Sequence, residues 1–416
     1  MLKKLVMEFK DELDALGVKV DKLDKRVAVL EDNLGGWKLR GIFWFDANFA
    51  GGDNPGTYTA NTNDTEFNKQ RFRLTLTKQI DENTSFYAQW RYGQSEGNGM
   101  GDLGWARGNG QGMRLRDLYV STKLPYDIDF KFGRIAIDFE GDYGFYDETD
   151  AMFSDYRVDG FQFKKAFGNF TGTAVIGRNA ARDQGGDGET GDFMNYVLDL
   201  NYTAERWFLG ATGYWFVDDE VAVAGDWNFN NYALYGGFNF TPAVKLMGIY
   251  NFQSNGGDLA NVLAGFAGAE DSPKAWKAIL TLDQSLLKFT ALRFEYMQHD
   301  NMFIGNRDYY GLGTDTANYA HVLQNMPWNN ETSKIFFVRA DQKWNDKWSS
   351  FLRYAQADFD TTGIDDAKMY GLGVKYQYTP AIAFRLAYDY VDSGEGLLND
   401  VNGDDHVIQF RTTVSF

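Results

Sequence analysis

The alternation of apolar and polar residues along 38–416 constrains the fold of this chain more than any other feature. In the final segment, Ile408, Phe410, Val414 and Phe416 share one parity, whereas mostly polar residues take the other. Successive side chains of a β-strand point to opposite faces of its sheet. A tilted strand of about ten residues spans the hydrocarbon of a bilayer. An apolar outer face with a polar inner face is typical of a transmembrane barrel, so the sequence predicts an all-β transmembrane pore.

The composition supports a barrel rather than a bundle of membrane helices. Aromatic residues make up 17% of the chain, with 34 Phe, 24 Tyr and 11 Trp, more than an ordinary soluble core requires. A barrel places them on its lipid face and in girdles at both interfaces. Mean hydropathy is nevertheless −0.44, and no segment approaches the roughly 18 apolar residues of a membrane helix. A barrel with a wet lumen fits both observations.

Several classes of function are disfavoured by what the sequence lacks. There is no cysteine, hence no disulfide framework, thiolate metal site or cysteine nucleophile. A net charge of −17 argues against nucleic acid as a partner. Neither a phosphate-binding loop motif nor His-Glu-x-x-His occurs. His299, His321 and His406 lack the spacing of metal ligands. We therefore expect neither an enzyme nor a bound metal or cofactor.

Residues 1–36 form a separate unit with a different period. Apolar residues recur there at intervals of four and three, which is a heptad pattern, and Gly35 and Gly36 end it. The predicted coiled-coil core comprises Leu2, Val6, Phe9, Leu13, Leu16, Val20, Leu23, Val27, Leu30 and Leu34. Valine at a with leucine at d favours a parallel dimer, although the pattern alone does not fix the number of helices. The alternative is an amphipathic helix packed on its own domain.

Residues 37–416 are predicted to form a large antiparallel up-and-down β-barrel of 16 to 18 strands. Eighteen are counted, and one mistaken hairpin would reduce the number to 16. The expected strands are 37–49, 66–78, 84–95, 112–124, 127–137, 157–167, 169–179, 191–203, 206–218, 228–240, 243–254, 274–284, 288–300, 333–344, 347–359, 367–379, 381–393 and 404–416. Short turns alternate with longer loops, as in outer-membrane barrels. Either strand number leaves an aqueous channel.

The start of the chain does not resemble an export signal. Met1-Leu2-Lys3-Lys4 begins like one, but charged residues interrupt the stretch that follows, so there is no apolar core segment. Because a barrel of this kind must be exported, we expect the sequence to be a mature or trimmed form.

The chain resembles a known family of outer-membrane porins. The terminal Phe416 behind alternating apolar residues is similar to the signal that directs barrels to the insertion machinery. The large barrel with its long third loop resembles trimeric general-diffusion porins. The helix that runs through Gly35-Gly36 into the first strand resembles porins with an S-layer-homology tether, a periplasmic coiled-coil stalk and a C-terminal barrel. In that family the tether domain holds the outer membrane to the cell wall. This domain is absent from the sequence, so the resemblance implies cell-wall attachment only through an upstream domain.

Strand parity assigns arginines to the lumen. Within 66–78, Phe72 and Leu74 face the lipid, which places Arg71 and Arg73 in the lumen. Charges on the lipid face are costly, so arginines of the other strands are expected to face the lumen as well. The predicted basic wall of the constriction comprises Arg40, Arg71, Arg73, Arg91, Arg114, Arg116, Arg385 and Arg411.

Two members of this wall depend on a local irregularity. Arg114 and Arg116 share the parity of the apolar Leu118 and Val120. They face the lumen only if a β-bulge intervenes near Asp117.

An acidic loop at 138–156 is the predicted opposite side of the constriction. Its proposed pore-facing carboxylates are Asp138, Glu140, Asp142, Asp147, Glu148 and Asp150. The loop also carries large apolar and aromatic side chains, which favour folding into the lumen as in porins. Acidic loop against basic wall would create a transverse field that orients dipolar solutes. The alternative is that the lumen-facing arginines form interior ion pairs with acids such as Glu295 or Asp389, and the loop is a solvated surface feature.

The sequence thus predicts a porin for passive diffusion of ions and small hydrophilic solutes, located in the outer membrane of a diderm bacterium with its N-terminal helix in the periplasm. The expected partners are further copies of the chain, most often three by the family resemblance, together with outer-membrane lipids and the insertion machinery. A structural tether with a plugged barrel is the first alternative. An outer-membrane hydrolase with its site at the barrel rim is the second.

Overall fold

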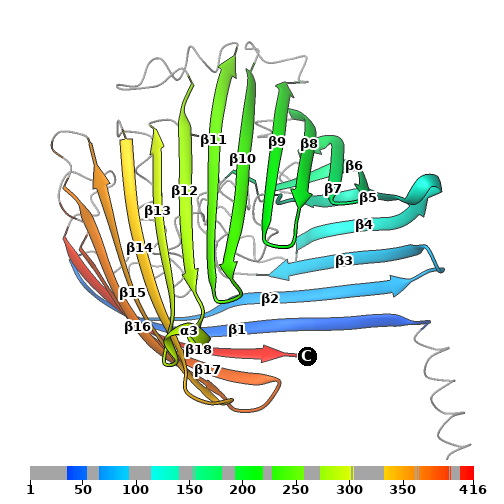
Figure 1. Ribbon diagram of the computed structural model, residues 1–416. Coiled ribbons are helices and arrows are strands. Elements are labelled where there is room, and N and C mark those ends of the chain that lie inside the picture. The colour runs from blue at the N-terminus through cyan, green and yellow to red at the C-terminus, as the bar shows by residue number, and fades with distance from the viewer. Residues whose placement is uncertain are drawn as a thin grey trace, which may run out of the picture.

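A computed structural model describes residues 35–53, 65–92, 114–139, 153–154, 156–179, 193–218, 227–256, 272–300, 303, 332–360, 363, 365–392, 394 and 403–416. Within these ranges the chain forms one closed sheet of eighteen antiparallel strands, each paired with its neighbours in sequence (Figure 1). The predicted count of 18 is therefore confirmed and the alternative of 16 is wrong. The predicted coiled coil of residues 1–34 lies outside the described residues.

The strands begin and end within a few residues of the predicted limits. They are β1 (Trp37–Gly52), β2 (Thr65–Gln79), β3 (Thr84–Tyr92), β4 (Arg114–Leu124), β5 (Ile128–Ile137), β6 (Tyr156–Phe167), β7 (Phe170–Asn179), β8 (Phe193–Thr203), β9 (Trp207–Asp218), β10 (Trp227–Thr241), β11 (Val244–Gly256), β12 (Lys274–Leu282), β13 (Ala291–Asp300), β14 (Thr332–Lys343), β15 (Trp348–Phe359), β16 (Ala367–Gln377), β17 (Ile382–Asp392) and β18 (Asp404–Ser415).

The first and last strands close the barrel. Ile42–Gly52 of β1 pair with Asp405–Ser415 of β18. The backbone of Phe416 extends this pairing: Gly41 N–H donates to its carbonyl (2.7 Å) and its own N–H donates to Gly41 O (3.0 Å). Closure leaves no unpaired sheet edge to solvent or lipid.

Short connections gather at one rim, which we call the turn rim, and long connections lie at the other, the loop rim. Side-chain oxygens stabilise several of the short turns. Asn83 and Thr84 donate their backbone N–H groups to Asp81 Oδ1 (2.8 and 2.9 Å). Asp283 accepts from Ser285 N (2.8 Å) and so caps the one-turn helix α3, Gln284–Leu287. The sequence predicts only a short turn between strands 274–284 and 288–300, because one helical turn is too short to produce a period.

The two faces of the sheet differ as the alternation predicts. On β18, Gln409 and Arg411 are 0% and 4% exposed and point inward, whereas Ile408 and Phe410 are 40% and 43% exposed and point outward. Among the described residues, none of the helices is long and apolar enough to cross a membrane.

Aromatic side chains form two girdles on the outer face. At the turn rim, Trp37 contacts Phe86 edge-on and Trp348 contacts Tyr376 (centroids 5.4 and 4.5 Å apart). Nearer the loop rim, a second girdle runs across β9 to β17. It contains Trp215, Tyr232, Phe252, Tyr250, Trp276, Tyr296, Phe336, Tyr354, Tyr370 and Tyr390. Paired girdles that flank an apolar band are characteristic of transmembrane barrels.

Candidate functional site

The inner wall of β15 to β17 holds a buried ion pair between strands that are not adjacent. Arg353 on β15 donates through Nη2 (2.7 Å) and Nε (3.1 Å) to Asp389 Oδ1 on β17. Gly371 on β16 is the Cα partner of both residues. A Cβ at this position would overlap Asp389 Oδ1 and Arg353 Nε. The missing side chain of Gly371 therefore makes room for the ion pair.

A second inner cluster lies on β12 and β13. Glu295 forms ion pairs with Lys277 Nζ (2.8 Å) and with Arg293 Nε (2.5 Å). All three side chains are largely buried, and Lys277 and Glu295 are almost fully so. Burial of charges is tolerated only when the charges are paired and hydrogen-bonded. Interior ion pairs with Glu295 and Asp389, which the sequence left open as an alternative for the lumen-facing arginines, are thus formed by Arg293 and Arg353.

Arg411 lies on the inner face where β18 pairs with β1. Its Nε and Nη2 donate to the two oxygens of Asp46 (2.7 and 2.6 Å), and its guanidinium lies 4.3 Å from the ring centroid of Trp44. Arg385 on β17 is the Cα partner of Arg411 and contacts Gln409 Oε1 through Nη2. Both arginines therefore lie on the inner face, as strand parity predicts.

A third group of arginines lies on β2 to β4. Arg73, Arg91 and Arg114 are successive Cα partners across these strands. The register shifts between Gln89 and Trp90, so that Arg116 is the extra residue of β4. This β-bulge next to Asp117 is the irregularity on which the sequence prediction depended, and it brings Arg114 opposite the inward-facing Arg91.

For Arg40 and Arg71, the remaining residues of the predicted wall, the structure supports the inward parity but shows no inner ion pair among the described residues. Arg40 has inward parity but is exposed near the turn rim. The backbone of Arg71 pairs with Trp44, an inner position. The side chains of Arg71 and Arg114 lie outside what the structure describes.

Together these groups make a basic belt on the inner face from β12 through β18 to β4. Strand parity could have found three further members that the sequence analysis overlooked: Lys277, Arg339 and the acidic partner Asp46. Arg339 is the Cα partner of both Arg293 and Arg353, so three arginines follow one another across β13, β14 and β15. Their proximity depends on strand register, which parity alone does not give.

The wall of β5 to β10 is different, because its inner face is largely apolar. Here the two ends of the 138–156 connection make contact. Phe153 packs on Tyr214 and Phe216 of β9 (centroids 4.8 and 5.8 Å apart), and Phe139 N–H donates to Ser154 Oγ (3.2 Å). Both ends therefore lie against the inside of the barrel, on the side away from most of the basic belt.

The acidic residues predicted for this loop are described only in part. Asp138 follows β5 and is half-buried. The others, Glu140, Asp142, Asp147, Glu148 and Asp150, lie outside the described residues.

A polar cluster interrupts the apolar wall on β8 to β10. Asp199 accepts from Thr212 Oγ1 (2.7 Å) and from the hydroxyl of Tyr235 (2.5 Å). The Tyr235 ring lies over Gly210 of the strand between, where a Cβ would overlap it. As at Gly371, a glycine on the middle strand lets residues two strands apart make contact. Here the Asp199 carboxylate is held by hydrogen bonds from two hydroxyl groups, whereas Asp389 is held by an arginine.

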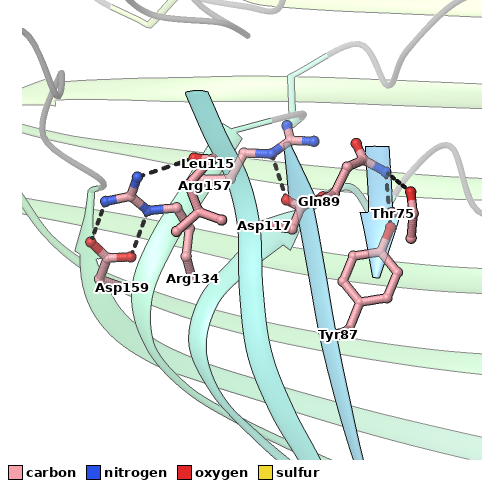
Figure 2. A network of polar contacts seen from close by, with 8 residues as sticks. All are labelled: Thr75, Tyr87, Gln89, Leu115, Asp117, Arg134, Arg157 and Asp159. Atoms are coloured by element: carbon pink, nitrogen blue, oxygen red, sulfur yellow. Dashed lines mark hydrogen bonds and ion pairs between the residues drawn. The ribbon is translucent and has the colours of Figure 1, made fainter. Parts of the chain in front are cut away.

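Figure 2 shows a polar network where β4 and β5 separate. Their backbone pairing ends at Leu118 and Arg134. Beyond that point, Arg134 Nη1 donates to Leu115 O (3.4 Å) and Arg157 Nε donates to Asp117 Oδ1 (3.1 Å). Arg134 also forms a two-pronged pair with Asp159 (2.9 Å for each contact). Side chains thus connect the strands where the backbone ladder stops.

Comparison with known proteins supports the fold. No family model and no curated protein matches the chain. Solved structures do: OprD of Pseudomonas aeruginosa matches with a TM-score of 0.55 at 13% identity, over 91% of this chain and 95% of that one. OccK9 (OpdG) of the same organism gives 0.57 at 13%, over 92% and 99%. OpdK, solved with vanillate, gives 0.56 at 11%, over 91% and 98%. At such identities the likeness establishes the eighteen-stranded barrel fold.

Proposed function

We propose that this chain is an outer-membrane porin that allows passive diffusion of ions and small hydrophilic solutes. The observation that carries the proposal is a charged inner belt inside a closed barrel whose outer face is apolar and bears two aromatic girdles. Barrels of this strand number enclose an aqueous channel. The similarity in fold to OprD, named in its structure as an outer membrane protein, supports this location.

Conductance in a planar bilayer tests the proposal directly. Purified protein should produce large, steady ionic currents. A folded barrel without current would favour the alternative of a plugged structural tether. A rim-located hydrolase has no supporting geometry in the part of the chain that the structure describes.

We further propose that the basic belt and the acidic 138–156 loop define the constriction. The anchoring of Phe153 on β9 supports this arrangement, since it holds one end of the loop on the far side of the lumen from the belt. Opposed charges across a narrow lumen would orient dipolar solutes.

Reversal potentials across a salt gradient test this second proposal. Arg73→Gln with Arg91→Gln should shift selectivity toward cations, because loop carboxylates would then dominate the local potential. Glu140→Gln with Glu148→Gln should shift it the other way. Lys78→Gln is the control, since Lys78 lies over the outward-facing Trp37 at the turn rim. The shifts should shrink in molar salt, where the Debye length falls to about 3 Å. Unchanged selectivity in both double variants would refute the constriction.

The heptad pattern of residues 2–34 supports a homo-oligomer, which we propose to be a trimer by the porin resemblance, with a periplasmic stalk that links to the cell wall through an upstream domain. Leu16→Asp with Leu23→Asp places charges at core positions and should abolish the helical signal of the stalk. Circular dichroism with analytical ultracentrifugation measures both helix content and copy number. An unchanged helical signal would exclude the stalk.

A further inference from the structure

The inner face of the barrel carries a second set of cations, close to the turn rim. Each lies within a few residues of the strand end that joins a short turn, and each shares the inward parity of a buried residue further along its strand. We call this set the turn-rim cations. They are Lys38 and Arg40 on β1, Lys123 on β4, Lys131 on β5, Lys164 on β6, Lys245 on β11, Lys343 on β14 and Lys375 on β16.

The turn-rim cations differ from the basic belt in their access to water. In the belt, the side chains of Arg353 and Arg411 are 1% and 4% exposed and form ion pairs with inner carboxylates. At the rim, the side chains of Lys123 and Lys343 are 48% and 65% exposed. A solvated ammonium group keeps its charge available to a solute, whereas a buried guanidinium group bound to a carboxylate does not.

Few carboxylates share this part of the inner face. Within three residues of the strand ends, the described inner positions hold Asp129 and Asp341, and Asp341 is bound by Arg339 (2.9 Å). Lys123, Asp129 and Lys164 are successive Cα partners across β4, β5 and β6. One carboxylate thus lies between two ammonium groups. Positive charge is therefore in excess on the inner side of this rim.

Carboxylates of the short turns engage two of the turn-rim cations. Lys123 pairs with Asp127 and Lys343 pairs with Asp346 (3.8 and 3.2 Å). The side chains of all four residues are exposed. Such pairs contribute little and are screened by salt, so a more highly charged solute can compete for these lysines.

Lys38, Lys164 and Lys375 are the least engaged of the set. All three residues are exposed, and none of them forms an ion pair with a carboxylate in the described part of the chain. Lys245, by contrast, interacts electrostatically with Asp283 beside α3. The three less engaged lysines lie on β1, β6 and β16, so free positive charge is distributed around the mouth of the barrel.

The chemistry of these side chains suits anions of varied shape. A lysine ammonium group has three donors on a flexible stem. The neighbouring inner positions carry hydroxyl and amide groups that can donate further hydrogen bonds, among them Thr75, Ser121, Thr173, Asn201, Thr281 and Ser349. A mouth lined by one sign of charge, with low-dielectric walls, raises the local concentration of the opposite charge. The attraction grows with the charge of the solute.

We propose that the turn-rim cations bind soluble multivalent anions, which are solutes with two or more phosphate or carboxylate groups, at the mouth of the barrel where the short turns lie. The proposal rests on the channel function proposed above. It concerns a region separate from the constriction, because apart from Arg40 these residues are not members of the basic belt. A monovalent anion is held weakly here, since single exposed charge contacts contribute little.

A titration with inorganic pyrophosphate tests the binding without requiring a current. Phosphorus NMR of the full chain in a phosphorus-free detergent measures the dissociation constant. Lys164→Gln with Lys375→Gln should raise it by about threefold or more, the effect of losing two exposed charge contacts. Acetate at the same concentration should displace little pyrophosphate.

The matched control is Lys78→Gln with Lys165→Gln. Lys165 follows Lys164 in the chain but has the opposite parity, and it lies over the ring of the exposed Phe167. Lys78 likewise lies over the outward-facing ring of Trp37. The control removes the same charge from the same rim on the outer face, so it should leave pyrophosphate binding unchanged. Resistance of the folded band to SDS at room temperature verifies folding for every variant.

Single-channel recording places the site along the lumen. Pyrophosphate should interrupt the wild-type current, and the interruptions should become rarer in the Lys164 and Lys375 double variant. They should also become rarer as the salt concentration rises, because screening shortens the range of the attraction. If Arg73→Gln with Arg91→Gln abolished the interruptions while the lysine variant kept them, the anion would bind at the constriction and the inference would be wrong.

Equal dissociation constants for wild type and the lysine variant would overturn the inference, and so would displacement by acetate as effective as that by added pyrophosphate. The two proposals fail separately. Normal currents without pyrophosphate binding reject the anion region alone. Pyrophosphate binding that depends on the two lysines, in a protein that carries no current, supports the anion region and rejects the proposed channel.

Discussion

Arg353 and Asp389 form a fully buried ion pair across an intervening strand, with Arg353 Nη2 2.7 Å from Asp389 Oδ1. They lie on β15 and β17, and the only side-chain position between them is Gly371 of β16. Two strand spacings separate their backbones by roughly 10 Å, which a long arginine side chain can span only if nothing projects from the middle strand. The glycine thus has a steric role in the basic belt.

Gly371→Ala should therefore destabilise the barrel. The new methyl group would overlap both charged partners and force them apart, and breaking a buried ion pair costs about 3–5 kcal/mol. Unfolding in urea with detergent micelles, followed by tryptophan fluorescence, measures the change. Gly248→Ala is the control, because its nearest neighbour would lie 3.9 Å from the added carbon. Equal stability of the two variants would mean that the ion pair tolerates the methyl group.

Phe153→Ala should loosen the attachment of the 138–156 loop to β9. The ring packs against Tyr214 at 4.8 Å and is 7% exposed, so its removal leaves the loop end without its aromatic contact. We expect larger and noisier single-channel currents than in wild type. Phe167→Ala, which removes an exposed ring at the turn rim, should leave the currents unaltered. A narrower pore in the Phe153 variant would contradict the anchor.

Acid should weaken the turn at Asp283. Hydrogen bonds from the side chain and backbone of Ser285 lower the pKa of Asp283 from its ordinary 3.8. A group whose folded pKa is depressed contributes stability above its unfolded pKa, and this contribution is lost as pH falls through the folded value. Stability should therefore decline below about pH 4.

Asp283→Asn separates this effect from general acid sensitivity. Asparagine keeps an N-cap acceptor for Ser285 but does not titrate. The variant should lose less stability than wild type between pH 5 and pH 3, as measured by thermal unfolding. Asp81, whose pKa is lowered chiefly by the backbone N–H of Asn83, offers an independent repeat as Asp81→Asn. Parallel pH profiles in wild type and both variants would argue against the assignment.

Removal of Phe416 should reduce the amount of assembled barrel. Its ring covers Gly41 of β1 and stacks on Phe72 of β2 (centroids 6.3 Å apart), so it fastens the closing strand pair on the outer face. It is also the residue that resembles the insertion signal. We expect less heat-modifiable protein in the membrane fraction for Phe416→Ala, with unchanged conductance per channel. Wild-type amounts would show that neither role is required.

The sequence predicted those features that depend on local period. Strand number and the inward parity of Arg385 and Arg411 could be worked out, and a bulge on β4 could be named as the condition for an inward Arg114, because a period of two depends only on neighbours in the chain. The bulge was inferable because charged and apolar residues on β4 otherwise shared a face. The helix after Asp283 was missed, since a single turn is too short to show a period.

Which residues meet was decided by the tertiary structure. Parity placed Arg353 and Asp389 on the inner face, but their contact depends on the register of three strands and on the absence of a side chain at Gly371. In the same way, Arg134 lies opposite Asp159 only because the β5–β6 register places it there, and it bridges to Leu115 because the β4–β5 ladder ends at Leu118. The sequence determined the face on which each side chain lies, since alternation is a property of one strand. Register, shear and closure determined its partners, because they are set by pairing among strands distant in the chain.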